Sequence, residues 1–371
     1  MFSGAGGLSL GFEMAGFKVD LAIEAQKNYM DTYKLNNPKC ICLNADITEL
    51  KPNEIERKYL NNGKIKGIIG GPPCKGFSTV GNRKLTDPRN MLIYYFIQWV
   101  DYFKPNFYVM ENVPGILSMD KGGVVKKVKN IYDDIGYSCN MHVLLATEFG
   151  VPQVRKRVFL IGNSSSLRDI KIKKTNQQDA KQKALFEESN LPPFLTVKEA
   201  FSDIIDVPPI VGKISDDVAI EYPNSTKTKY QKYLRANSET LYDHYAPNHS
   251  ALVKKRISLI KPGKNHSSLP KEYQLKGGYS NIYGRLELNK PADTITANCG
   301  CVSAPGRFIH PVQDRAISVR EAARLQSFPD SYRFTGNLSE KYKQVGNAVP
   351  PLMAFAIAKS IKRDRVKKLT N

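Results

Sequence analysis

The stretch Gly70-Gly71-Pro72-Pro73-Cys74-Lys75-Gly76-Phe77-Ser78 is the most informative part of the chain for its fold. It follows the short apolar run 66–69, so two glycines end a predicted strand and two prolines stiffen the backbone that leaves it. Open α/β sheets carry their reacting groups at the carboxyl ends of their strands. The pattern therefore predicts an α/β fold that presents Cys74 at a sheet edge, where a thiol can act as a nucleophile. A buried structural cysteine after a turn is the alternative.

Composition limits the classes of protein that the chain can belong to. Its 371 residues, 41% of them hydrophobic, suffice for one large domain and a smaller one. The 55 Lys and Arg residues outnumber the 35 Asp and Glu residues, which gives a net charge of +20. This excess favours a polyanionic partner, with a generally basic surface as the alternative. The sequence has no apolar run of membrane-spanning length and no signal segment, so we expect a cytoplasmic protein without a membrane partner.

The cysteines do not indicate a metal site. Two pairs, Cys40 with Cys42 and Cys299 with Cys301, are each separated by one residue, which is shorter than the spacing of zinc knuckles. The other two cysteines and the five histidines are scattered along the chain. We therefore expect neither a bound metal nor a disulfide framework.

The first residues form a glycine loop that leads into a helix. Gly4, Gly6 and Gly7 let the backbone turn tightly and approach a ligand, and the apolar residues that follow begin the helix. A glycine loop at a helix N-terminus suits a nucleotide-like ligand, although a simple tight turn is an alternative. Ser9 stands where the dinucleotide fingerprint has its third glycine, so a hydride-transfer dehydrogenase is a poor fit.

Two acids follow at the ends of the next two predicted strands. Glu24 ends the strand 18–23 and lies 20 residues after Gly4, the distance at which an acid reaches the ribose hydroxyls of a nucleotide. Asp46 follows the short strand 40–43 and is placed to accept from an adenine amino group. Either acid alone could be a solvated surface residue or a helix cap. Together with the glycine loop they favour an adenosine-type ligand.

The middle of the chain adds further polar residues at strand ends. Residues 75–90 have no periodicity and predict a functional loop, of the kind that closes over a site. The strand 107–110 ends at Glu111, and Arg155 and Arg157 lead into the apolar strand 158–162. Arginines at a strand start are often surface charge. Directed inward, such a pair suits anionic oxygens.

The second half of the chain has a different composition. Residues 163–190 are rich in Ser, Lys, Gln and Asn, and residues 191–310 lose the alternation of strands and helices. This loop-rich, basic and aromatic region suits DNA contact, or it is an ordinary small domain. A helix returns at Ser318, where Glu321 completes a capping box, and a closing helix is predicted over 352–361.

Six sequence blocks resemble those of the cytosine-C5 DNA methyltransferases and stand in the order of that family. The blocks are Phe2–Gly7, Gly70–Ser78, Glu111–Gly115, Gln153–Gly162, Arg320–Pro329 and Gln344–Pro350. The resemblance covers nearly everything except about 163–275. It implies a Rossmann-like S-adenosylmethionine-dependent methyltransferase domain with a smaller, loop-rich target-recognition domain. Residues 1–190 would be the catalytic and donor-binding domain, 191–310 the target-recognition domain, and 311–371 would return to the catalytic domain.

The resemblance also implies a reaction and the residues that perform it. S-adenosylmethionine is the methyl donor and a cytosine flipped out of DNA is the acceptor. Cys74 looks like the nucleophile that adds to C6, and Glu111 like the group that donates to N3. Arg157 looks placed to hold the base O2, and Arg155 to support the site or a phosphate. The implied contacts to the donor are Phe2, Gly4, Gly6, Glu24, Asp46, Ile47, Pro73, Leu92 and Asn347.

The implied partner is double-stranded DNA, bound by a monomer of a restriction–modification system, with a cognate restriction endonuclease acting on the same site. Ser78 and Arg83 belong to the loop that would close over the DNA, and Thr296 to a strand that would touch its backbone. Only Met1 precedes Phe2, so we expect the first strand of the sheet to be nearly absent. A catalytically silent DNA-binding protein and a tRNA cytosine methyltransferase of the same fold are the alternative functions.

Overall fold

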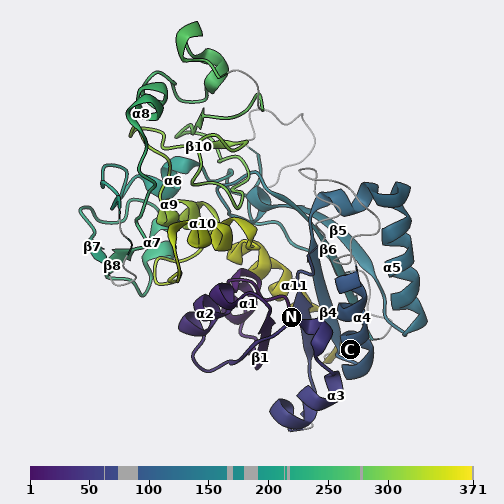
Figure 1. Cartoon of the computed structure of the whole chain (residues 1–371). Helices are drawn as coiled ribbons and strands as arrows, with labels where there is room; N and C mark the ends of the chain where they lie inside the picture. Colours follow the sequence, from purple (N-terminus) through teal and green to yellow (C-terminus); the bar gives the residue numbers. More distant parts are fainter. Residues whose placement is uncertain are drawn as a thin grey trace. The chain divides into compact units, whose positions relative to one another are not determined.

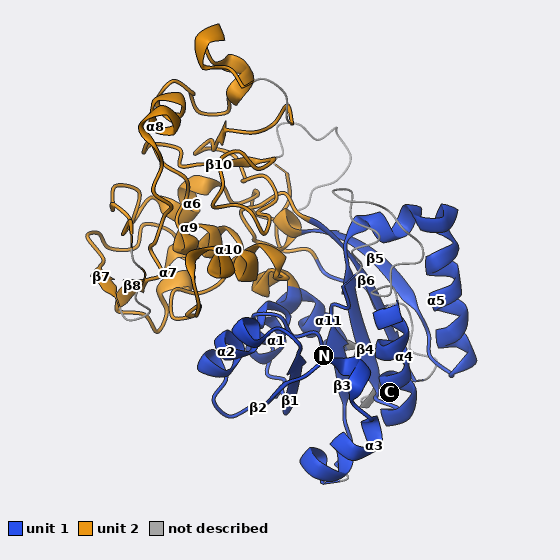
Figure 2. Cartoon of the chain, in the orientation of Figure 1, with its two compact units in different colours: residues 1–145, 156–173, 354–371 blue, residues 146–155, 174–353 orange. Residues whose placement is uncertain are grey.

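The computed structural model describes residues 1–61, 63–73, 91–164, 170–178, 191–212, 214, 218–275 and 279–369, with backbone alone for 364–369. Figure 1 traces the elements in chain order. The chain divides into two compact units, coloured separately in Figure 2. Unit 1 comprises Met1–Leu145, Lys156–Lys173 and Ala354–Asn371, and unit 2 comprises Ala146–Arg155 and Lys174–Met353. The functional domains expected over 1–190, 191–310 and 311–371 stay a prediction.

Unit 1 is built on parallel and antiparallel strands. They are β1 (Leu21–Glu24), β2 (Ile41–Asn44), β3 (Gly67–Gly70), β4 (Phe107–Asn112), β5 (Asn140–Leu145) and β6 (Lys156–Asn163). β1 pairs with β2 in parallel, and a second sheet has the order β3-β4-β6-β5. β3 and β4 are parallel, whereas β6 is antiparallel to both of its neighbours. The carboxyl ends of β3 and β4 therefore meet at one edge.

Residues 1–3 lie between the two sheets of unit 1. The Met1 nitrogen donates to the Ile69 carbonyl of β3 at 2.9 Å, and the Ser3 N–H donates to the Ile23 carbonyl of β1 at 3.1 Å. Gly70 has no room for a side chain, because a Cβ there would overlap the Met1 carbonyl oxygen. These three residues thus bridge β1 and β3 by single hydrogen bonds without forming a regular strand, as we expected from the sequence.

The helices of unit 1 cover both faces of β4. They are α1 (Gly7–Met14), α2 (Lys27–Asn36), α3 (Pro52–Ile55), α4 (Leu92–Phe103), α5 (Gly123–Asp134) and α11 (Pro351–Leu369), of which the part from Ala354 belongs to this unit. Tyr108 and Met110 pack with α4 and α5 in one apolar cluster. Phe107 points to the other face, where its ring stacks on Phe12 of α1 at 6.1 Å. β4 is consequently apolar on both sides, as a central strand must be.

Several 3₁₀ helices and one π-helix also occur in the described parts of the two units. They are η1 (Ile47–Glu49), η2 (Glu56–Leu60), η5 (Pro114–Gly122), η6 (Ala146–Phe149), η8 (His266–Ser268) and η9 (Lys271–Tyr273). Trp99 of α4 is 2% exposed within an apolar cluster, so it packs in the core.

Unit 2 has short strands and many loops, as its composition predicted. Its helices are α6 (Val197–Phe201), α7 (Lys229–Arg235), α8 (Ala251–Ser258), α9 (Val319–Leu325) and α10 (Leu338–Asn347). Its strands are β7 (Ala219–Glu221), β8 (Thr240–Tyr242), β9 (Gly284–Arg285) and β10 (Arg307–Ile309). β7 pairs with β8 in antiparallel fashion and β9 with β10 in parallel, so each sheet has two strands.

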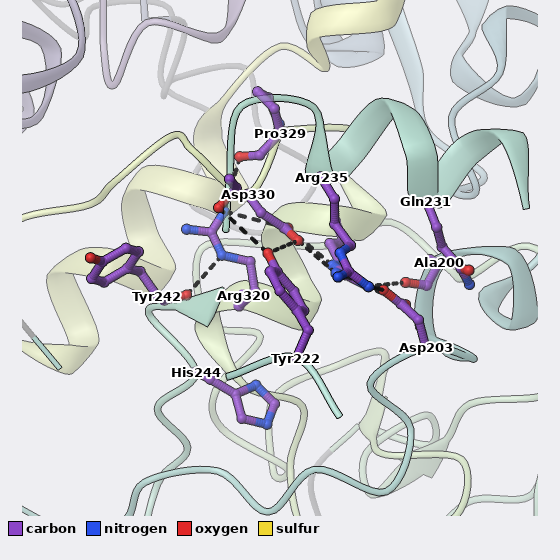
Figure 3. Close-up of polar contacts among 12 residues, drawn as sticks. Ala200, Asp203, Tyr222, Gln231, Arg235, Tyr242, His244, Arg320, Pro329 and Asp330 are labelled. Atoms are coloured by element: carbon purple, nitrogen blue, oxygen red, sulfur yellow. Dashed lines mark hydrogen bonds and ion pairs between the residues drawn. The ribbon is translucent and has the colours of Figure 1, made fainter. Parts of the chain in front are cut away.

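Helix α9 organises unit 2 through buried charges. It begins at the predicted capping box of Ser318 and Glu321. One turn apart on this helix, Arg320 and Arg324 are both 0% exposed. Arg324 pairs with Asp203 and Asp330, each with a shortest distance of 2.6 Å, and Figure 3 labels both acids.

Arg320 connects the same helix to other segments of the unit. Its guanidinium donates to the carbonyls of Tyr242 and Pro329, which Figure 3 labels, and to the carbonyl of Tyr332. It also pairs with Asp243, which accepts from Lys341 at 2.7 Å. Buried cations are tolerated only when they are paired and hydrogen-bonded in this way. Each arginine of α9 thus ties distant segments of unit 2 together.

No helix in the described ranges is long and apolar enough to cross a membrane. The described part of the chain contains no group of three or more His, Cys, Asp or Glu residues arranged to hold a metal ion.

Candidate active site

The residues that lead to Cys74 are fixed against the end of β4. Gly70 of β3 pairs with Met110 of β4, so the residues that follow them, Gly71 and Glu111, also lie close together. A Cβ on Gly71 would lie 2.9 Å from Oε2 of Glu111. A side chain at this position would therefore require the Glu111 carboxylate to shift. One residue on, the buried amide of Asn112 donates to the Pro72 carbonyl at 3.2 Å. Cys74 itself, like Ser78 and Arg83, lies outside the described residues, but Pro72, two residues before it, is anchored by Asn112.

Glu111 forms an ion pair with Arg157 of β6. Nε of Arg157 lies 3.0 Å from Oε1 of Glu111, and the two side chains are only 13% and 14% exposed. Burial lowers the pKa of the Arg157 guanidinium, and the Glu111 charge opposes that effect. An arginine remains protonated at neutral pH despite such shifts. The sequence placed these two residues at strand ends, and the antiparallel pairing of β4 with β6 brings them into contact.

The glycine loop curls against Glu24. The N–H of Gly4 donates to Oε2 of Glu24 and the N–H of Gln26 to Oε1, both at 2.9 Å, so the carboxylate is held in one orientation. Gly4 has a φ of +53°, and nothing lies within 4 Å of where its Cβ would be. Gly6 also has a positive φ, of 95°. The loop thus needs its glycines, and it leaves open space beside a fixed carboxylate.

Other residues implied to contact the donor lie in the same unit. Phe2, Ile47 and Leu92 belong to one apolar cluster, which also includes Ile23, the residue before Glu24. Oδ1 of Asp46 accepts from the backbone and the hydroxyl of Thr48, each at 2.9 Å, which leaves Oδ2 of Asp46 without a hydrogen bond to the described residues. The structure therefore brings an apolar surface and two acids together around the glycine loop.

Three residues implied by the resemblance lie in unit 2. Arg155 is 0% exposed and donates to the backbone carbonyls of Ile295, Gly346 and Ala348. Its guanidinium is buried and cannot reach a DNA phosphate. Arg155 can therefore support the site, as we considered, but it cannot make the phosphate contact that was the other expectation. Thr296 is half-buried, and Asn347 is exposed at the end of α10.

Sequence reasoning assigned no role to three buried amides near these positions. Asn112 anchors the Pro72 carbonyl, and Gln153 and Gln326 hydrogen-bond to each other at 3.0 Å. Each lies inside or beside a block that we had quoted for the resemblance. A polar amide within an apolar stretch was the available signal, since such residues are buried only when their hydrogen bonds are satisfied.

Comparisons with known proteins identify the class. The family described as C-5 cytosine-specific DNA methylases matches residues 1–363. The type II methyltransferase M.DdeI of Desulfomicrobium norvegicum is 37% identical, over 97% of this chain and 87% of its own. M.AgeI, a type II methyltransferase of Thalassovita gelatinovora, is 32% identical over 98% of both chains. A crystal structure assigned as a prophage-encoded DNA modification methyltransferase (E. coli) has a TM-score of 0.78 at 28% identity, with 98% of both chains covered.

The mixed α/β architecture of unit 1 is therefore a methyltransferase fold that matches DNA methyltransferase structures, as predicted. The chain belongs to the C-5 cytosine-specific DNA methylase family. It is a type II DNA (cytosine-5)-methyltransferase of a restriction–modification system, which confirms the resemblance that the six sequence blocks carried.

Proposed function

We propose that this methyltransferase uses S-adenosylmethionine to methylate C5 of a cytosine flipped out of double-stranded DNA, through a covalent adduct with Cys74. The observation that carries the proposal is the shared edge of β3 and β4. There Asn112 holds the Pro72 carbonyl, two residues before Cys74, while Glu111 and Arg157 lie side by side. A nucleophile, a proton donor and a fixed cation are the groups that attack on a pyrimidine ring requires.

The chemistry assigns one task to each side chain. The Cys74 thiolate forms a bond to C6, and the electron pair of the C5–C6 double bond becomes available at C5. Glu111 acts in its protonated form and donates that proton to N3, so the ring carries no negative charge, and the Arg157 guanidinium donates to O2 and orients Glu111. C5 takes the methyl group, and the electrons of the broken S–C bond stay on the donor sulfur. Water then takes the C5 proton, N3 returns its proton to Glu111, and the electron pair of the C5–H bond restores the C5–C6 double bond as the thiolate leaves.

The glycine-loop residues fit S-adenosylmethionine, which supplies an electrophilic methyl group on a sulfonium when it is bound. Each Glu24 oxygen accepts one backbone N–H and retains a lone pair that can accept from a ribose hydroxyl. Oδ2 of Asp46 can accept from an adenine amino group, and the cluster of Phe2, Ile47 and Leu92 offers an apolar surface for the ring. Gly6, Pro73 and Asn347 complete the proposed contacts.

The proposed DNA contacts come from Ser78, Arg83 and Thr296, with residues 191–310 as the target-recognition domain. Support comes from the charge distribution. Between Asp243 and Glu272 the chain has no acid, and α8 carries Lys254, Lys255 and Arg256. Lysines and arginines neutralise DNA phosphates in this way. We place the enzyme in the cytoplasm, as a monomer that protects sites cut by a cognate restriction endonuclease.

Replacement of Cys74 tests the proposed adduct. Cys74→Ser removes the thiolate, so we expect methyl transfer to DNA to fall below detection while binding of S-adenosylmethionine, measured by equilibrium dialysis, stays within about twofold of wild type. Cys301→Ser changes an exposed cysteine and serves as the matched control with normal activity. Methylation by Cys74→Ser at a near wild-type rate would remove Cys74 from the mechanism.

A further inference from the structure

Three fully buried polar side chains of unit 2, Gln153, Arg155 and Gln326, form a connected cluster, which we call the polar knot. All three are 0% exposed. The Gln153 amide donates to Oε1 of Gln326 at 3.0 Å and to the Leu325 carbonyl at 3.1 Å. The Gln326 amide donates in turn to the Val345 carbonyl at 2.7 Å. The knot therefore joins the segment after η6 to the end of α9 and to α10.

The knot holds Ile295 from both sides. Its N–H donates to Oε1 of Gln153 at 2.8 Å, and its carbonyl accepts from Nη1 of Arg155 at 2.8 Å. With both backbone groups of Ile295 bound to buried side chains, the next residue, Thr296, has a fixed starting point. The hydroxyl of Thr294 adds a bond to the Val154 carbonyl at 2.7 Å. This segment is thus held more firmly than a loop with solvated backbone groups.

The same guanidinium holds both neighbours of Asn347. Nη2 of Arg155 donates to the carbonyls of Gly346 at 2.9 Å and Ala348 at 3.0 Å. Gly346 also packs directly on the Thr296 segment, because a Cβ there would overlap the carbonyl group of Thr296. One buried cation therefore fixes the distance between the backbone that carries Thr296 and the backbone that carries Asn347.

We propose that Arg155 is a positioning residue that couples the DNA contact at Thr296 to the donor contact at Asn347. This inference rests on the proposed function, because the roles of Thr296 and Asn347 come from it. Arg155 acts without touching either substrate, since its side chain is fully buried and its three donors point at backbone carbonyls. A planar guanidinium suits this role because it presents several donors in a fixed geometry.

The test measures two binding steps in Arg155→Met. Loss of the guanidinium frees both segments together, so we expect the Kd for S-adenosylmethionine without DNA and the KM for DNA each to rise about tenfold or more. Arg320→Met is the matched control. Arg320 is also buried and donates to the carbonyls of Tyr242, Pro329 and Tyr332, but it flanks neither contact residue. Its loss should lower Tm and leave both constants of the folded enzyme within about twofold.

Two gentler variants keep the test valid if Arg155→Met does not fold. Arg155→Lys keeps the charge but lacks the fork that reaches three carbonyls, and Gly346→Ala separates the two segments without changing any charge. Both should raise the same two constants, by severalfold. A mutant cycle adds specificity: Arg155→Lys combined with Asn347→Ala should weaken donor binding little beyond the stronger single variant.

The outcomes separate this inference from the proposed function. If Thr296→Ala weakens DNA binding and Asn347→Ala weakens donor binding, but the Arg155 variants change only Tm, the coupling role is overturned and the site assignment stands. If the double variant Arg155→Lys with Asn347→Ala weakens donor binding by the product of the two single effects, the coupling role is also overturned. If Thr296→Ala and Asn347→Ala change neither constant, the site assignment fails and the positioning role fails with it.

Discussion

At the scale of single residues, Glu111 and Asn112 share a strand end but have different tasks. Glu111 pairs with Arg157 at 3.0 Å, and we propose that it meets the substrate ring. Asn112 turns into the protein and satisfies the Pro72 carbonyl. The end of the strand thus carries the Glu111 carboxylate, and the next residue, Asn112, holds the Pro72 backbone two positions before Cys74. A side chain on Gly71 would lie within 2.9 Å of the Glu111 carboxylate and force it to move.

Replacement of Asn112 tests the positioning of that loop. Asn112→Ala leaves the buried Pro72 carbonyl without its partner, which costs about 1–3 kcal/mol, and it loosens the stem before Cys74. We expect kcat for DNA methylation to fall at least tenfold while the Kd for S-adenosylmethionine changes less than about threefold. Asn106→Ala, an exposed asparagine at the start of the same strand, is the control. A normal kcat in Asn112→Ala would show that the stem does not need this anchor.

At the scale of secondary-structure elements, α9 holds unit 2 together by charge. The pairs of Arg324 with Asp203 and Asp330 are fully buried, and the Arg324 charge holds the pKa of Asp330 below its usual value against the opposing effect of burial. The positive charge of Arg324 is stabilised in turn by both carboxylates. Removal of one partner therefore leaves the remaining charges buried without their counter-charge.

Replacement of Arg324 tests this view. Arg324→Met leaves two buried carboxylates short of their cation, so we expect the free energy of unfolding to drop by about 3–5 kcal/mol. Urea unfolding followed by circular dichroism measures the change. Lys343→Met, at an exposed position of α10, should change stability by no more than about 0.5 kcal/mol. A similarly small effect of Arg324→Met would mean that the buried pairs add nothing beyond what packing supplies.

The local sequence pattern predicted the helices and strands whose formation depends mainly on neighbouring residues. The strand expected over 107–110 forms the first part of β4, and the capping box at Ser318 starts α9. Helix α10 was missed, since the two helices expected in this region begin at Ser318 and at residue 352. Asn337 and Glu340 form a capping box that marks its start, and this signal was present in the sequence. The order of the strands in the sheet could not be predicted from local sequence, since it depends on pairing between strands that are distant in the chain.

The candidate site was predictable only in part for the same reason. Cys74, Glu111 and Arg157 could be placed at strand ends from pattern and resemblance. The pairing of Glu111 with Arg157 required the register of β4 against β6. Arg155 was expected at the site or on a phosphate, but its acceptors lie 140 to 193 residues further along the chain, beyond the reach of any local pattern.

At the scale of the whole molecule, two buried histidines make stability depend on pH. Burial lowers the pKa of His310 to about 4 and also lowers that of His244. The neutral form of His310 is required because its Nδ1 accepts from the N–H groups of Val312 and Gln313. Glu321, 3.5 Å from Nε2 of His310, stays ionised because Arg315 holds its pKa far below the usual value despite burial. The folded state thus excludes protons that the unfolded chain would bind.

The sign of the effect follows from the lowered pKa values. Below pH 6.5, the ordinary pKa of a free histidine, the unfolded chain takes up protons and the folded chain does not, so the free energy of unfolding falls as pH falls. His310 alone contributes a loss of about 3 kcal/mol between pH 6.5 and about 4. Urea unfolding at several pH values measures the slope. His310→Gln, which can still accept a backbone N–H, should make the slope shallower, and stability that is flat between pH 7 and pH 5 would contradict the account.

The most direct test of the central claim is transfer of a tritiated methyl group from S-adenosylmethionine to separate pools of unmethylated double-stranded DNA and tRNA. The account predicts label on DNA alone, and nucleoside analysis should recover it as 5-methylcytosine, as expected for a DNA (cytosine-5)-methyltransferase of this family. Label on tRNA alone, or no label on either pool, would contradict it.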